Sequence, residues 1–221
     1  MVVLGHSQGG LLTKPLAIDS GDRFWARISD QDFETLEMED EPKELLRGAL
    51  FVEPLPFVSE LIFLATPHRG SDLAGPQLVR RIAQRFVRLP SDLVRVGADL
   101  FTVLPQAGAS VALSRIPTSI DNMSPGHPYI KTLSEIPVDP RVKAHSIIAI
   151  AIAIGEGRAP LASASDGVVR YASVHIDEVE SEVTVRSPHS GMQAAPQTIE
   201  EVRRILLQPS RASACPVSGY D

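Results

Sequence analysis

Residues 1–10, MVVLGHSQGG, place a short apolar run directly before a serine that glycines flank on both sides. Residues 1–4 (MVVL) are apolar and partly β-branched, which predicts a buried strand. Residues 5–9 (GHSQG) match the pattern G-x-S-x-G, and residues 10–12 (GLL) begin a segment of helical character. This pattern between a strand and a helix predicts a nucleophile elbow, a sharp turn that exposes the serine hydroxyl.

Each residue of the elbow has an expected role. We predict Ser7 as the nucleophile, with His6 beside it in the turn. Small residues at Gly5 and Gly9 would let neighbouring backbone pass without a Cβ clash. The backbone N–H of Gln8, at the start of the helix, would donate to an oxyanion on the substrate. The alternative interpretation is a glycine-rich turn whose serine has no role.

The apolar runs along the chain predict an α/β fold. Three of the four runs are apolar on both faces, which is typical of strands covered by helices in a parallel sheet. Strands alternating with helices predict a mostly parallel sheet with helices on both faces. We expect strands at residues 1–4, 61–65, 146–154 and 182–186, and helices at residues 8–17, 42–50, 75–87 and 196–207.

The first and last of these helices carry specific expectations. Pro15 should kink or end the first helix, because proline disrupts a helix interior. In the last helix, apolar residues recur at helical spacing and should face the core. These residues are Ile199, Val202, Ile205 and Leu206.

An acid is expected after the third strand, because a triad built on such an elbow follows the order serine, acid, histidine. Asp166, in residues 165–169 (SDGVV), is the candidate, and its carboxylate would orient an imidazole. Its rivals are Asp177, Glu178 and Glu180, in a charged run that is expected to be solvated. The alternative for Asp166 is a plain Asp-Gly turn.

His189, in residues 188–191 (PHSG), is the predicted base. It follows the last predicted strand and precedes the final helix, and it comes after Asp166 in the chain. Each other histidine lacks this order or this strand-end position: His6, His68, His127, His145 and His175. The alternative is a loop histidine without a catalytic role.

The composition argues against several other classes of protein. A net charge of −6 disfavours nucleic acid as a partner. The one cysteine, Cys215, provides neither a disulfide nor a cysteine metal site, and we expect no metal or organic cofactor. No run approaches the roughly 18 apolar residues of a membrane helix. The default location is cytoplasmic, although a signal peptide could have preceded residue 1.

With these motifs in place, the chain resembles the α/β-hydrolase superfamily, and more narrowly its lipase/esterase-like branch. The motifs are GHSQGG at 5–10, LATPHRGS at 64–71, SDGVV at 165–169 and PHSG at 188–191. The second motif is similar to a loop of triacylglycerol lipases and inositol-deacylase-like proteins that borders the active site. Thr66, Pro67 and His68 are therefore expected to be adjacent to the site, with a structural role favoured over direct catalysis.

The resemblance implies a hydrolase of carboxylic esters, of lipid-like acyl type, that works through an acyl-enzyme on Ser7, with His189 and Asp166. The same triad could serve a thioesterase, an amidase or an acyltransferase. A partial α/β-hydrolase domain is expected over residues 1–207, with a disordered tail at 208–221. A lid or cap is expected at about residues 71–140. Its apolar residues would line an acyl pocket or belong to the core: Leu93, Val94, Leu100, Phe101, Val103 and Leu104.

One departure from the family concerns the elbow strand, which is the fifth of eight in the α/β-hydrolase fold and the first here. The loop that normally gives the second oxyanion donor is then absent, and loss of one donor costs roughly 10²–10³ in rate. Residues 1–4 would form an apolar edge strand. We therefore expect the C-terminal portion of a hydrolase. The alternatives are an inactive remnant of such an enzyme or, in another class, a lipid-binding or interaction module.

Overall fold

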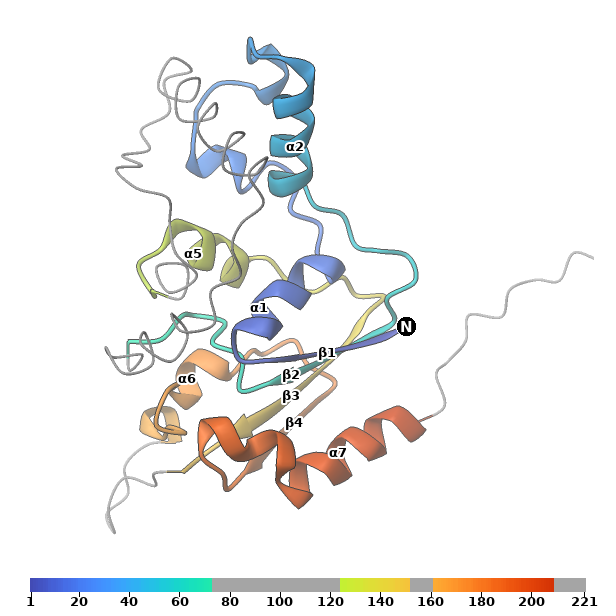
Figure 1. Ribbon diagram of the computed structural model, residues 1–221, viewed down its shortest axis with the longest axis vertical. Helices are drawn as coiled ribbons and strands as arrows, with labels where there is room; N and C mark the ends of the chain where they lie inside the picture. The colour runs from blue at the N-terminus through green and yellow to red at the C-terminus, as the bar shows by residue number, and fades with distance from the viewer. Residues whose placement is uncertain (73–123, 152–160, 209–221) are drawn as a thin grey trace, which may run out of the picture.

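The computed structural model describes residues 1–72, 124–151 and 161–208. In this part of the chain, four parallel strands form one sheet in the order β1-β2-β3-β4, which is also their order in the sequence (Figure 1). The register pairs Val3 with Leu61 and Phe63 with Ser146. The strands are β1 (Val2–His6), β2 (Glu60–Leu64), β3 (Lys143–Ala149) and β4 (Ser181–Val185).

The central strands β2 and β3 are buried on both faces of the sheet, and the apolar side chains of β2 alternate between two cores. On β2, Ile62 and Leu64 pack in one core cluster, whereas Leu61 and Phe63 pack in another. The first cluster includes Ile205 of the C-terminal helix. The apolar runs therefore form the α/β architecture that the sequence predicts.

Helices cover the two faces of the sheet (Figure 1). Helices α1 and α5 lie on one side, and α7 lies on the other. The α-helices are α1 (Gln8–Thr13), α2 (Asp40–Leu50), α5 (Pro128–Glu135), α6 (Tyr171–Val174) and α7 (Pro196–Leu207). Short 3₁₀ helices are η1 (Lys14–Ala17), η2 (Trp25–Arg27), η3 (Phe33–Thr35), η5 (Leu161–Ser163) and η6 (His189–Ala194).

The third strand differs most from its predicted range. It begins at Lys143 and ends at Ala149 rather than covering residues 146–154. The Ile150 N–H still donates to the carbonyl of Val185, the last residue of β4, and the main chain then leaves the ladder, because the Ala151 N–H donates to the carbonyl of Ser165. Residues 152–154 lie outside the described part. The alternating Ile and Ala side chains indicate a buried segment, but they do not fix where its backbone changes partner.

The first helix changes its geometry just before Pro15. The α-helix ends at Thr13 and continues as the 3₁₀ helix η1, with Pro15 in its first turn. Proline lacks the N–H that a continuing α-helix requires. The predicted disruption is confirmed.

Helix α7 has the predicted bounds, but the predicted apolar face is partly wrong. Ile205 is buried, whereas Ile199 and Leu206 are 56% and 55% exposed. Thr198 and Glu201 are buried instead. Successive residues are about 100° apart around a helix. If the face that contacts the sheet is centred one residue away from the predicted position, apolar residues on the predicted face become exposed. The packing against η6 and β4 fixes this rotation, which the helix sequence does not specify.

The predicted lid at residues 71–140 lies mostly outside the described residues, as do the helix expected at 75–87, the apolar candidates at 93–104 and the tail at 209–221. Within the described end of that stretch, α5 packs Ile130 and Leu133 against Leu11 of α1. Strand β1 lies at one end of the described sheet, and Leu4 is 46% exposed there. No helix of the described ranges is long and apolar enough to cross a membrane.

Candidate active site

Ser7 lies at a sharp turn between β1 and α1. Its main chain has φ 55° and ψ −127°, and a positive φ is strained for a residue with a Cβ. The Ser7 N–H donates to the carbonyl of Leu64 at 2.8 Å, at the end of the neighbouring strand. Its side chain remains partly exposed. The strand-to-helix geometry of the predicted elbow is therefore present.

Gly5 and Gly10 allow the close packing of this turn. A Cβ on Gly5 would lie 2.6 Å from the Cα of Gly10, and one on Gly10 would lie 1.9 Å from Oγ1 of Thr66. A Cβ on Gly9 would meet no atom of the described residues within 4 Å. The prediction that Gly9 must be small to avoid a Cβ clash is therefore wrong. The close approach between α1 and the loop after β2 is at Gly10, one residue after Gly9.

Asp166 is almost completely buried, at 3% exposed, and both of its carboxylate oxygens are bonded. Oδ1 accepts from the N–H groups of Val168 and Val169 at 2.9 and 2.7 Å. Oδ2 lies 2.6 Å from Nδ1 of His189. Gly167 has φ 91°, a conformation that favours glycine. The Asp-Gly turn and the contact with histidine thus coexist, and the turn directs one oxygen toward the imidazole.

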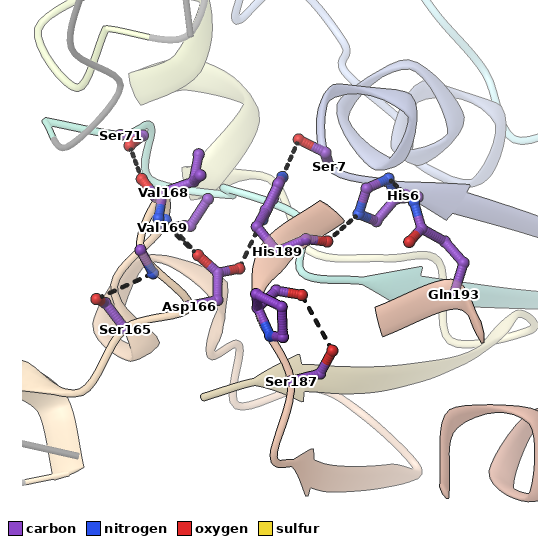
Figure 2. A network of polar contacts seen from close by, with 12 residues as sticks. His6, Ser7, Ser71, Ser165, Asp166, Val168, Val169, Ser187, His189 and Gln193 are labelled. Atoms are coloured by element: carbon purple, nitrogen blue, oxygen red, sulfur yellow. Dashed lines mark hydrogen bonds and ion pairs between the residues drawn. The ribbon is translucent and has the colours of Figure 1, made fainter. Parts of the chain in front are cut away.

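His189 joins Ser7 and Asp166 in one chain of hydrogen bonds (Figure 2). A carboxylate accepts, so Nδ1 carries the proton that is donated to Asp166, and Nε2 remains as the acceptor. Nε2 lies 2.9 Å from Oγ of Ser7. Ser7 follows β1, Asp166 follows β3 and His189 follows β4, and parallel strands bring their carboxyl ends to one edge of the sheet. The three predicted residues are therefore together at that edge.

The rival residues lie elsewhere or contact other groups. Asp177 lies 3.1 Å from Nε2 of His175, and Glu182 lies 2.7 Å from its Nδ1. The hydrogen bond to Glu182 is the main cause that raises the pKa of His175. His127 accepts at the start of α5, and His145 contacts Ser181 from within β3. None of these contacts involves Ser7.

The loop after β2 contains the predicted site-adjacent residues Thr66, Pro67 and His68, all buried. Thr66 packs against Gly10 of α1. The carbonyl of Pro67 accepts from Gly70 in a turn. His68 meets the ring of Phe63 edge-on, at 4.6 Å between ring centroids. None of the three has a described hydrogen bond to the Ser7, His189 or Asp166 side chains.

The same loop also contacts the segment that follows Asp166. Arg69 donates to the carbonyls of Ala172 and His175, and the Ser71 hydroxyl donates to the carbonyl of Val168. The loop therefore packs against α1 at its first end and against the acid-bearing segment at the other. This arrangement supports a structural role for the motif.

His6 and Gln193 form a second layer of contacts that the sequence motifs do not reveal. Nε2 of His6 lies 3.2 Å from the main-chain oxygen of His189, and Nδ1 lies 3.0 Å from Nε2 of Gln193 (Figure 2). Burial is the largest effect that lowers the pKa of His6, and the neighbouring His189 lowers it further. The G-x-S-x-G pattern places His6 in the turn but specifies no partner for it.

Gln8 is the first residue of α1 and directly follows Ser7. Within the described residues, no group of three or more His, Cys, Asp or Glu side chains could hold a metal ion.

No protein-family model matches the sequence, and no curated protein matches it either. Among solved structures, the chain is similar to the lipase BlEst2 of Bacillus licheniformis in its mature form. The TM-score is 0.41 and the identity is 14%, over 93% of this chain and 64% of the lipase. This chain thus spans less than two thirds of the length of that lipase.

Proposed function

We propose that the protein is a serine hydrolase of carboxylic esters with an α/β-hydrolase type of active site. The observation that carries this proposal is the continuous chain from Ser7 Oγ through His189 to Asp166, with separations of 2.9 and 2.6 Å. Both distances are within hydrogen-bond range, and Nδ1 faces the carboxylate while Nε2 faces the hydroxyl, which is the orientation that a general base requires. The strained main chain at Ser7 supports the same assignment.

The proposed reaction proceeds through an acyl-enzyme. Ser7 Oγ attacks the ester carbonyl carbon while its proton moves to Nε2 of His189, and Asp166 stabilises the imidazolium that forms. The tetrahedral oxyanion accepts from the Gln8 N–H. When the intermediate collapses, the C–O bond to the alcohol breaks, and His189 returns the proton to the leaving oxygen. Water, activated by His189, then releases the acid and restores Ser7.

The substrate is proposed as a carboxylic ester with a lipid-like acyl group, on the resemblance of the motifs to lipases. The residues expected to line the acyl pocket lie outside the described ranges. A thioesterase or an acyltransferase would use the same three residues with another leaving group or acceptor.

The proposal is tested by covalent labelling with a fluorophosphonate and by hydrolysis of p-nitrophenyl butyrate. We expect the 221-residue protein to be labelled and Ser7→Ala to lose both labelling and turnover. Ser134→Ala is the matched control, because Ser134 bonds a carbonyl within α5 and should leave both unchanged. A folded wild-type protein that takes no label and hydrolyses no ester would refute the proposal and favour the inactive remnant.

A further inference from the structure

Two segments, one with Asp166 and one with His6 and Ser7, each contact both the main chain and the side chain of His189. On the acid side, the His189 N–H donates to the carbonyl of Asp166 at 3.1 Å, and Nδ1 contacts the carboxylate of that residue. On the nucleophile side, the His189 carbonyl lies 3.2 Å from Nε2 of His6, and Nε2 of His189 contacts Ser7. His6 and Ser7 are consecutive, so one short segment contacts both ends of the residue.

The partners of His6 define its protonation. A carbonyl oxygen only accepts, so Nε2 of His6 must carry a proton and donate it to His189. The other nitrogen, Nδ1, faces the side-chain amide of Gln193, whose NH₂ group can donate to it. A neutral ring with its proton on Nε2 satisfies both contacts, whereas a second proton on Nδ1 would oppose the amide donor.

His189 and Gln193, which the His6 side chain contacts, both belong to η6. His189 is the first residue of this 3₁₀ helix, and Gln193 lies four positions later. The rings of His6 and His189 lie 5.0 Å apart between centroids. A contact with both ends of the short helix restrains its position and rotation relative to β1, and hence the distance from the imidazole to Ser7.

On the basis of the proposed esterase function, we propose that His6 is a positioning residue: as a neutral Nε2–H imidazole it fixes the main chain of His189, and this holds Nε2 of the His189 side chain at hydrogen-bond distance from Ser7 Oγ. The neutral form matters because the base becomes positively charged during the reaction. A second positive charge at this distance would oppose that step. Gln193 contributes by keeping Nδ1 as an acceptor.

Two substitutions of similar size and equal charge test the role of the donor. In His6→Gln the side-chain amide can reach the position of Nε2, whereas in His6→Asn it reaches only that of Nδ1. We expect His6→Gln to keep most of the kcat for p-nitrophenyl butyrate. We expect His6→Asn to lose about 10²-fold in kcat with little change in KM, because a displaced base slows the chemical step rather than substrate binding. Circular dichroism and thermal melting establish that both variants fold.

Equal kcat values for the two folded variants would overturn the proposal, whether both were active or both were impaired. The tautomer of His6 is measured independently by ¹⁵N NMR of the wild-type protein at neutral pH. A neutral ring protonated at Nε2 supports the proposal, and one protonated at Nδ1 overturns it. This measurement needs no turnover, so it distinguishes failure of the positioning role from failure of the esterase function, which fluorophosphonate labelling reports.

Discussion

The two carboxylate oxygens of Asp166 contact different groups. One oxygen holds the turn through the N–H groups of Val168 and Val169, and the other faces the imidazole of His189. The three donors fix the carboxylate, which in turn fixes the tautomer of His189. A residue that replaces one oxygen with an NH₂ group would keep the shape but could reverse the direction of one hydrogen bond.

We therefore expect Asp166→Asn to lower kcat by about 10³–10⁴-fold while the protein still folds, because the imidazole would take the wrong tautomer. The measurement is ester hydrolysis at saturating substrate. Asp177→Asn is the matched control: its carboxylate contacts His175, at an exposed position, and its loss should leave kcat unchanged. Wild-type turnover by a folded Asp166→Asn protein would remove Asp166 from the proposed triad.

Helix α1 is held against the loop after β2 at one glycine. Gly10 and Thr66 approach so closely that a single added methyl group would overlap the threonine side chain. This contact fixes the first turn of the helix, and with it the turn at Ser7. The neighbouring Gly9 has no such contact among the described residues.

The two glycines provide a matched pair for one prediction. We expect Gly10→Ala to lower the free energy of unfolding by about 1–3 kcal/mol through overpacking. We expect Gly9→Ala to be neutral or to raise it by up to about 1 kcal/mol, since alanine favours the helix. Urea unfolding measures both. If Thr66→Ala, combined with Gly10→Ala, failed to restore part of the lost stability, the overlap would not be the cause.

The stability of the whole molecule toward acid should depend on His68. The side chain is 1% exposed, and neither ring nitrogen has a hydrogen-bond partner among the residues that the structure describes. Burial, with smaller effects from Lys14 and Arg69, lowers the pKa of His68 from 6.5 to about 3. As pH falls below about 6.5, His68 becomes protonated in the unfolded chain but stays neutral in the folded protein. The contribution of His68 is therefore complete above pH 6.5 and is lost as the pH falls toward 3.

Between pH 6.5 and 3 we expect the free energy of unfolding of His68→Leu to fall less steeply than that of the wild type, because unfolding takes up about one proton fewer. At the acid end the difference should be on the order of several kcal/mol. Urea unfolding at a series of pH values measures this slope. His175 should have the opposite effect on the pH dependence of stability, because its pKa is raised in the folded protein. Its stabilising contribution is present below pH 6.5 and is lost as the pH rises through the folded pKa. An unchanged acid slope in His68→Leu would contradict the prediction.

Much of the fold follows from local patterns. Residues 61–64 are apolar throughout because β2 is covered on both faces, and such a run predicts a parallel strand without reference to its neighbours. The order of Ser7, Asp166 and His189 follows from the same logic, since parallel strands deliver the residues at their carboxyl ends to one edge. The conformational demands at Pro15 and Gly167 are also local.

Other features depend on contacts between distant parts of the chain. His6 and Gln193 are 187 positions apart, and neither residue type indicates the other as its partner. The end of β3, the exposed side of α7 and the close approach at Gly10 likewise depend on which surfaces meet when the elements pack. The sequence alone specified the four strands of the described sheet and roughly where they lie, as well as the elbow and the order of the three candidate residues, because these follow from side-chain chemistry and local backbone preference. The tertiary structure alone decided the distances between those residues and the contacts that hold His189 in place, because packing sets the relative positions of elements that the chain leaves free.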